Sequence, residues 1–473
     1  MSRSKEFVKN TAVLTIGKAC TQFVNVLLIP LYTALLTTEE FGTFDVIISY
    51  ATLFLPLVNW QFDQGLYRFM LDVREDADGQ KRLFSSCLVS ACFQCIIYFV
   101  LFLLASTMIS IPYRAFLLGH VILHVFMSLL LQFIRGLGFN GKYAIASFIS
   151  AATTTLLNVV FLVWLKKGIT GLFISSILSQ MITILFMVIA SRAWRYFSVQ
   201  GFALQTVKEV GRYSFPLIPN NLAWWVVNVS DRMVITSFIS AAANGVYAIA
   251  NKFPNLFNQF FSILNLSWTE TVVLHYHDED RDSFFSKTIS SMFILFFSAC
   301  ICVMAAMPFV FRFFVVNESY YGAFDQIPIL LFGMLFRVLV GLYSSIYVAQ
   351  KNAKKIAVTS VLSAVINLSV DLLLIRYIHL FAASVSTLVA FIAMFTVRYI
   401  DVNRQIRIRI LSKYVIYSVA LGLLNILSYY LGSMPVRAVV LAVTVVLSVF
   451  INREMLLKLK NMVLARLLHR RNS

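Results

Sequence analysis

The chain has 473 residues, of which 60% are hydrophobic and only 13% are charged. Soluble domains carry about 25% charged residues, so this composition excludes a soluble cytosolic enzyme, a disordered chain and a secreted disulfide scaffold. The 39 Lys and Arg exceed the 21 Asp and Glu and give a net charge of +18, which favours the basic cytoplasmic loops of a membrane protein over a nucleic-acid partner. The sequence therefore predicts an all-α polytopic membrane protein.

The apolar stretches predict fourteen membrane-spanning helices. Each span needs about 20 apolar residues, and short loops join the stretches. The spans are expected at residues 10–36, 41–62, 83–109, 113–134, 143–165, 170–191, 213–238, 244–269, 288–315, 324–349, 356–375, 380–397, 414–431 and 435–452. No loop is long enough for a separate domain, and the basic start lacks a signal-peptide cleavage site.

The distribution of Lys and Arg orients these spans. With a cytoplasmic N-terminus, the cytoplasmic segments hold 29 of the 39 basic residues, including Arg398 in segment 398–413, and the other side holds five. This bias predicts that both termini are cytoplasmic. The tail 453–473 alternates apolar and basic residues and predicts an amphipathic helix on the anionic inner leaflet, with a frayed, solvated tail as the alternative.

Weak internal repetition divides the chain. Gly42 and Gly245, 203 residues apart, each follow the first span of their half, and segments 158–171 and 367–380 match at an offset of 209. The repetition predicts two six-helix lobes related as parallel repeats. The expected divisions are 1–200 for the N-terminal lobe, 201–405 for the C-terminal lobe, 406–452 for two additional helices and 453–473 for the basic tail. Transporters commonly bind substrate between such repeats.

Three segments resemble a known family. They are IPLYTALLTTEEFGTF within Lys9–Phe44, LLNVVFLVWLKKGITGLFISSIL at the joint of the fifth and sixth spans, and YSFPLIPNNLAWWVVNVSDRMVI at Tyr213–Ile235. They resemble bacterial polysaccharide flippases of the polysaccharide transporter family, within the multidrug/oligosaccharidyl-lipid/polysaccharide exporter superfamily. The chain departs from the pattern at one joint, where Tyr377-Ile-His-Leu380 replaces Gly-x-x-Gly.

The resemblance implies a two-lobe bundle in the bacterial cytoplasmic membrane. It implies outward flipping, by alternating access, of undecaprenyl-pyrophosphate-linked oligosaccharide repeat units for O-antigen, capsule or exopolysaccharide. Polysaccharide polymerase and chain-length machinery are the protein partners that it suggests.

Polar residues within the spans are expected to face a wet cavity, because they are costly in hydrocarbon. They recur at steps of three and four on the first, second, seventh and eighth spans, which correspond by the repeat. The stripes comprise Lys18, Gln22 and Asn25; Asp45, Ser49, Thr52, Pro56, Asn59 and Asp63; Asn221, Trp225, Asn228 and Arg232; and Asn251, Asn255, Asn258, Ser262 and Asn265, which Lys252 and Gln259 flank. They predict the lining of one central cavity, the alternative being hydrogen bonds between packed helices.

The basic residues within the spans suggest where a pyrophosphate would bind. Arg337 lies 13 residues into its span, roughly 20 Å deep at about 1.5 Å per residue. Arg232 follows Asp231, so an ion pair to a neighbouring helix competes with ligand binding. With Lys18 and Lys252, these residues are predicted to bind substrate, because Arg grips phosphate oxygens through a bidentate fork.

Enzyme chemistry is not expected. The chain contains no GxxxxGK[ST] motif for ATP, no Ser/His/Asp or Cys/His grouping outside the spans and no large extracytoplasmic loop, which disfavours a membrane glycosyltransferase. His120 and His124 have no third ligand nearby, so a polar lining or a packed pair is favoured over a metal site. We expect no cofactor and no metal. A lipid II-type flippase and a cation-coupled drug exporter of the same superfamily are the alternative functions.

Overall fold

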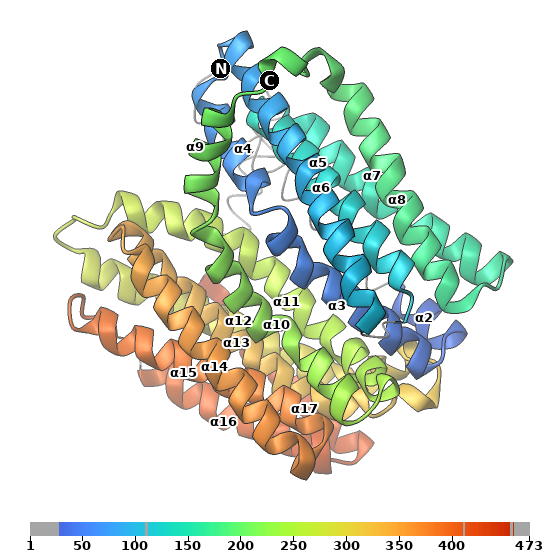
Figure 1. Ribbon diagram of the computed structural model, residues 1–473. Coiled ribbons are helices and arrows are strands. Elements are labelled where there is room, and N and C mark those ends of the chain that lie inside the picture. Colours follow the sequence, from blue (N-terminus) through green and yellow to red (C-terminus); the bar gives the residue numbers. More distant parts are fainter. Residues whose placement is uncertain (1–27, 109–111, 410–411, 455–456, 458–473) are drawn as a thin grey trace, which may run out of the picture. The chain divides into compact units, whose positions relative to one another are not determined.

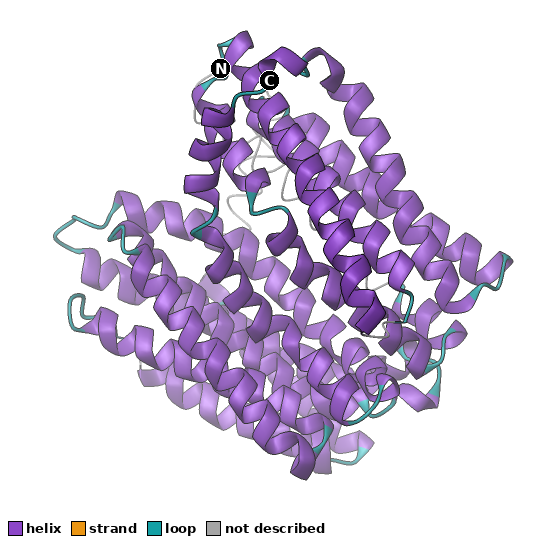
Figure 2. Ribbon diagram, viewed as in Figure 1, coloured by secondary structure: helices purple, strands orange, loops and turns teal. Residues whose placement is uncertain are grey.

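The computed structural model describes residues 28–108, 112–409, 412–454 and 457, and their regular structure is helical (Figures 1 and 2). The α-helices are α2 Ile29–Leu35, α3 Thr38–Val58, α4 Phe62–Asp72, α5 Ala77–Met108, α6 Arg114–Gly136, α7 Asn140–Val159, α8 Gly168–Ser191, α9 Leu204–Ser214, α10 Leu217–Phe238, α11 Ala241–Leu274, α12 Arg281–Phe314, α13 Ala323–Ala349, α14 Ala353–Ile378, α15 Leu380–Asn403, α16 Ser412–Leu431 and α17 Met434–Ile451. Four short π or 3₁₀ segments, η1 Val160–Trp164, η2 Ala193–Arg195, η3 Val199–Gly201 and η4 Glu318–Tyr320, complete the described helices.

Eleven of the described helical segments are long and apolar enough to cross a membrane. Helices α10 and α11 have 22 and 34 residues but are not among the eleven, because Asn, Lys and Arg interrupt their apolar sequence. Each predicted span from 83–109 onward coincides with a described helix. Lys18, Asn25 and most of the predicted tail helix lie outside the described residues.

The second predicted span is broken, which corrects the expectation of one helix over 41–62. Helix α3 begins with a capping box, in which Thr37 and Glu40 satisfy each other's backbone N–H groups, and it ends at Val58. Trp60 and Gln61 then adopt left-handed conformations with φ of 50° and 57°. The Asn59 side chain stabilises this turn, because its Oδ1 accepts a hydrogen bond of 2.8 Å from the Gln61 N–H.

Two further helices, α4 and α9, lie in segments expected to be loops. Helix α9 follows the α8–α9 connection and contains Lys208 and Arg212 on its exposed face, whereas Val210, Gly211 and Ser214 are buried. Their alternation of buried and exposed residues is that of a surface helix.

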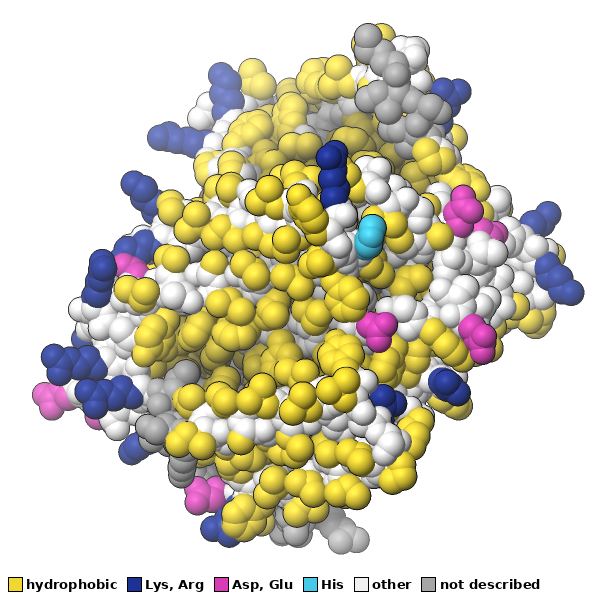
Figure 3. All heavy atoms as spheres, turned by 90° about the horizontal axis from the view of Figure 1, so that it is seen from below, with side chains coloured by type: hydrophobic (Ala, Val, Ile, Leu, Met, Phe, Trp, Pro, Cys, Tyr) yellow, Lys and Arg dark blue, Asp and Glu magenta, His cyan; other side chains and the backbone are white. Residues whose placement is uncertain are grey.

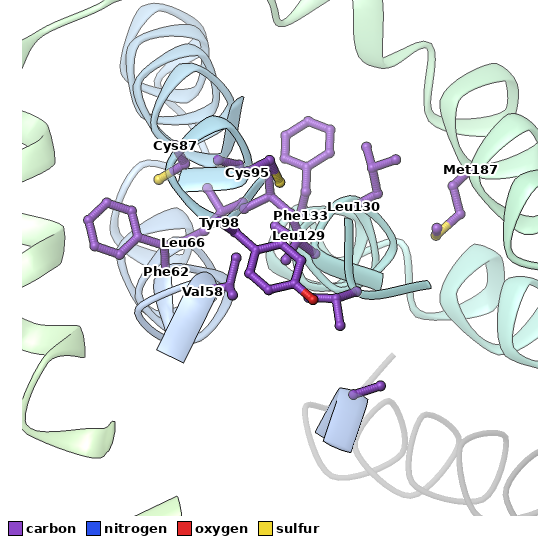
Figure 4. Close-up of a cluster of buried hydrophobic side chains, with 14 of the residues drawn as sticks. Val58, Phe62, Leu66, Cys87, Cys95, Tyr98, Leu129, Leu130, Phe133 and Met187 are labelled. Carbon is purple, nitrogen blue, oxygen red and sulfur yellow. The ribbon is translucent and has the colours of Figure 1, made fainter. Parts of the chain in front are cut away.

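The chain forms two compact units. Unit 1 comprises Met1–Ala248 with Ile375–His379, and unit 2 comprises Ile249–Leu374 with Leu380–Ser473. The core of unit 1 is an apolar cluster to which α3, α4, α5, α6 and α8 contribute (Figure 4). Within it, Phe84 and Phe133 pack with ring centroids 4.1 Å apart. The predicted division into lobes at residue 200 stays a prediction.

Unit 2 has its own core around α12 and α13. The last two helices, α16 and α17, pack against α12, and Tyr429 of α16 stacks on Phe324 of α13 with ring centroids 4.2 Å apart.

The face of the molecule that Figure 3 shows is covered mainly by hydrophobic side chains, and most of its charged side chains lie toward the margins. A surface of this composition fits a hydrocarbon environment.

Candidate substrate-binding site

In unit 1, the polar faces of α3 and α10 contact each other. Trp225 on α10 donates its indole N–H to Thr52 Oγ1 at 3.1 Å on α3. The Asn221 side chain donates to Gln61 Oε1, at the break after α3, over 2.8 Å. The structure thus brings together two of the polar stripes expected from the sequence.

An ion pair links the same two helices. Arg232 Nε lies 2.7 Å from Asp45 Oδ2, and these side chains are only 13% and 19% exposed. Arg232 Nη1 also donates to the backbone oxygen of Asn228 at 2.9 Å. Of the two roles considered for Arg232, this conformation shows the ion pair to a neighbouring helix, so a phosphate would have to compete with Asp45.

The adjacent carboxylate, Asp231, has a separate partner. Its side chain is 2% exposed, and its Oδ2 accepts a hydrogen bond of 2.7 Å from the Tyr247 hydroxyl on α11. Asp231 and Arg232 therefore connect α10 to two different helices, α11 and α3.

A second polar cluster lies at the break between α3 and α4. Asn59 and Asp63 are 3% and 7% exposed. Asn59 Nδ2 donates to Asp63 Oδ1 at 3.1 Å, and Gln64 Nε2 donates to Asp63 Oδ2 at 3.0 Å. The two predicted site residues are thus hydrogen-bonded to each other, although they belong to the turn and to α4 rather than to one continuous helix.

The remaining predicted residues that the structure describes belong to unit 2. On α11, Lys252, Asn255, Asn258 and Asn265 are half-buried. Arg337, in the middle of α13, is also half-buried and has its guanidinium carbon 5.8 Å from the ring centroid of Phe391 on α15. The predicted set is therefore divided between the two units.

Arg398, the first residue of the segment 398–413 that was expected to be a loop, is a buried cation. It lies on α15 with an exposure of 0%. Its Nε donates to Thr359 Oγ1 at 3.0 Å on α14, and its Nη1 donates to the Val340 backbone oxygen at 3.2 Å and to Ser344 Oγ on α13. Arg398 thus binds α13, α14 and α15 together through neutral oxygen atoms.

The expected polar packing of His120 is confirmed. The Gln180 side chain on α8 lies 2.8 Å from His120 Nδ1, and the Ser176 hydroxyl lies 3.2 Å from it. The His124 ring stacks beside that of His120, with centroids 5.9 Å apart. The pair therefore joins α6 to α8.

Comparisons with known proteins place the chain in a family. A model described as polysaccharide biosynthesis protein matches residues 7–269, more than half of the chain. The succinoglycan biosynthesis transport protein ExoT of Rhizobium meliloti (strain 1021) is 24% identical over 268 residues, which are 54% of this chain and 51% of ExoT. The chain thus aligns with about half the length of this curated relative.

Solved structures share the fold at low sequence identity. The lipid II flippase MurJ, in an inward closed conformation, superposes with a TM-score of 0.71 at 14% identity and covers 94% of this chain and 100% of MurJ. An inward-facing multidrug resistance MATE transporter of the MOP superfamily gives a TM-score of 0.64 at 15% identity, over 82% of this chain and 98% of the transporter. The protein is a multi-pass membrane protein with the MOP transporter fold, and the expectation that it is not an enzyme is confirmed. The chain belongs to the polysaccharide biosynthesis protein family.

Proposed function

We propose that this protein flips undecaprenyl-pyrophosphate-linked oligosaccharide repeat units across the bacterial cytoplasmic membrane for surface polysaccharide biosynthesis. The observation that carries the proposal is the charged and amide-rich contact between α3 and α10, built around Arg232 and Asp45. Polar side chains at this density inside an apolar bundle suit a water-filled transport path. The family membership supports a role in polysaccharide biosynthesis.

The proposed topology has fourteen spans with both termini in the cytoplasm. Eleven spans are long and apolar, and α10 and α11 supply two more. At about 1.5 Å per residue, their 22 and 34 residues are long enough for a hydrocarbon core of about 30 Å. The remaining span is the predicted first one, residues 10–36.

A reciprocal helix crossing supports two repeat-related lobes that move against each other. A methyl group on Gly42 of α3 would overlap the backbone oxygen of Ala241, and one on Gly245 of α11 would overlap the backbone oxygen of Thr38. Both pairs, Thr38 with Ala241 and Gly42 with Gly245, are separated by the same 203 residues. The contact therefore relates the two halves by the offset expected from the repeat, and we propose that the lobes close here when the cavity faces inward.

The substrate chemistry follows from the residue types. Arg337 and Arg232, with Lys252 and Lys18, are proposed to neutralise the pyrophosphate, because guanidinium groups bind phosphate oxygens through two parallel hydrogen bonds. The proposed contacts with sugar hydroxyls are amide and carboxylate side chains. They are those of Asn25, Asn59, Asp63, Asn221, Asn228, Asn255, Asn258 and Asn265.

The decisive experiment removes Arg337. We expect Arg337→Ala to stop export of surface polymer while the protein stays abundant in the membrane, and Arg337→Lys to recover only part, because an ammonium group lacks the bidentate fork. Arg232→Ala should also stop export. It should lower protein abundance as well, because Asp45 is left without its ion-pair partner.

Arg312 provides a matched control for Arg337. Its guanidinium lies at a similar distance from an aromatic ring, 5.6 Å from Tyr321, but its side chain is exposed near the end of α12. Arg312→Ala should therefore export polymer normally. Surface polymer and membrane-protein level are measured together, and normal polymer from Arg337→Ala would remove this residue from the transport path.

A further inference from the structure

A basic pocket lies at one end of unit 1, away from the polar faces of α3 and α10. The pocket has a volume of about 530 Å³. It is formed by the start of α5, the start of α7 and the end of α8 with the segment that follows. Its lining comprises Ala77, Lys81, Phe139, Lys142, Ala190, Ser191, Arg192, Arg195 and Tyr196.

The described residues that line the pocket include four positive charges and no carboxylate. Lys81, Arg192 and Arg195 are exposed, whereas Lys142 is half-buried. Within the described parts of the chain, none of the four forms an ion pair. The acidic residue Asp76, which lies close to Ala77 in sequence, accepts hydrogen bonds from the backbone of its own loop. A concave surface with this charge favours an anionic ligand.

Hydrogen bonds hold the walls of the pocket in place. Ser85 on α5 donates to the backbone oxygen of Tyr196 at 3.3 Å and accepts from the Ser198 N–H at 2.9 Å. Lys142 Nζ donates to the backbone oxygen of Ala190 at 2.9 Å and lies 4.2 Å from the ring centroid of Phe139. The connection after α8 is therefore fixed against α5, and Lys142 is positioned at the wall.

The surroundings of the pocket are those of a lipid-facing surface. Met181, Leu185 and Ile189 form an exposed stripe at steps of four along α8, and this stripe leads to the pocket at Ala190. Beyond the pocket, Trp194 is 56% exposed in the connection to α9, which is green in Figure 1. Trp is enriched where hydrocarbon meets lipid headgroups, so the pocket lies at headgroup level.

We propose that this pocket binds the headgroup of an anionic phospholipid, with the phosphodiester among Lys81, Lys142, Arg192 and Arg195 and an acyl chain along the exposed stripe of α8. In the proposed topology this end faces the cytoplasm, so the ligand belongs to the inner leaflet. Basic pockets between membrane helices on the cytoplasmic side are known to hold anionic lipid headgroups. A free phosphate would use the same charges but would gain nothing from the apolar stripe.

Native mass spectrometry of the purified full-length protein tests the site. The added lipids are phosphatidylglycerol and phosphatidylcholine with identical acyl chains. The test variant is Arg192→Gln/Arg195→Gln, and the control is Lys166→Gln/Lys167→Gln at the other end of α8. The two variants are matched, because each removes two exposed charges and includes one residue with positive φ, 53° at Arg192 and 48° at Lys166.

The wild type and the control should bind phosphatidylglycerol in preference to phosphatidylcholine. The test variant should bind phosphatidylglycerol about thirtyfold more weakly, from the typical contribution of each basic residue near an anionic lipid. Equal binding by the two double variants would overturn the proposal. If the test variant does not fold, the exposed residue Lys81 is replaced instead. Lys81→Gln should weaken phosphatidylglycerol binding about fivefold, and unchanged binding would contradict the proposal.

Soluble anions distinguish the two sources of phosphate. Inorganic phosphate and glycerol 3-phosphate, at the same concentration as the lipid, should leave phosphatidylglycerol binding unchanged, because they lack an acyl chain. Displacement of the lipid by either soluble anion would identify a site for free phosphate and overturn the assignment to a lipid.

Discussion

At the residue scale, the ion pair between Asp45 and Arg232 identifies the neighbouring helix that Arg232 contacts in this conformation. The sequence predicts that Arg232 lies within a span and shows that it follows a carboxylate, but it does not reveal which neighbouring helix supplies its partner. The structure shows that Asp45 on α3 pairs with it over 2.7 Å. The sequence periodicity placed both residues in polar stripes. It did not reveal that they contact each other, because that contact depends on how α3 and α10 pack.

The two glycines of the helix crossing provide a prediction at this scale. Gly42→Ala and Gly245→Ala should each force α3 and α11 apart, because the added methyl group meets a backbone oxygen that belongs to the opposite helix. We expect polymer export to fall at least tenfold, with the protein still inserted. A pair of cysteines introduced next to the crossing, one on α3 and one on α11, should crosslink in the otherwise wild-type protein. The same pair should not crosslink in either Gly→Ala variant.

Gly141→Ala is the control for this prediction. Gly141 lies in α7, and a methyl group there would meet no heavy atom within 4 Å in the described structure. Its export and crosslinking should match those of the wild type. Normal export by Gly42→Ala together with an intact crosslink would show that the crossing tolerates a side chain, contrary to the observed packing.

At the element scale, the sequence predicted long apolar helices better than the breaks between them. The predicted span 324–349 corresponds to α13 at Ala323–Ala349, because uninterrupted apolar sequence defines such a helix. The break at Asn59–Gln61 was not predicted, since Trp60 and Gln61 are not residues that favour left-handed conformations. A side-chain hydrogen bond from the Gln61 backbone to Asn59 stabilises the turn instead.

Arg398 was missed for a related reason. It lies close to a run of basic residues after 403, and the charge pattern alone does not distinguish a buried cation from exposed neighbours. In the structure, α15 continues to Asn403, so Arg398 is more than a turn inside the helix and is buried against α13 and α14. It is surrounded by the hydroxyl groups of Thr359, Ser360 and Ser344. These hydroxyl residues within two predicted spans are the feature of the sequence that could have indicated a buried cation.

Arg398 also provides a prediction at the element scale. Arg398→Ala should lower the free energy of unfolding by about 3 kcal/mol, because several buried polar groups lose a charged hydrogen-bond donor. Arg398→Lys should recover only part of this loss, since one ammonium group cannot replace the planar guanidinium between three helices. The midpoint of thermal unfolding in detergent measures the effect.

The control is Arg404→Ala, which removes an exposed cation directly after α15. Its free energy of unfolding should differ from that of the wild type by no more than about 0.5 kcal/mol, as for other surface substitutions. Its thermal midpoint should therefore stay close to that of the wild type. If Arg398→Ala unfolds at the same temperature as Arg404→Ala, the hydrogen bonds of Arg398 do not hold the three helices together.

At the scale of the whole molecule, the charge bias makes the proposed topology testable. Reporter fusions at Ser240, between α10 and α11, and at Asn317, after α12, should report the outside. Fusions at Gln200, in the connection after α8, and at Asn352, between α13 and α14, should report the cytoplasm. The opposite result at either pair would contradict the proposed orientation.

The reciprocal crossing of α3 and α11 has a consequence for the ancestry of the chain. Residue 42 meets residue 241 and residue 245 meets residue 38, which is the pattern that two identical subunits make at the axis of a homodimer. The symmetry is broken at one neighbouring position, where the Asn244 side chain donates to the Gly42 backbone oxygen at 2.9 Å and its counterpart by the 203-residue offset is Phe41. A gene duplication that fused two half-length subunits would leave such a contact, and the contact would outlast the divergence of the two halves that has since reached the residues beside the glycines.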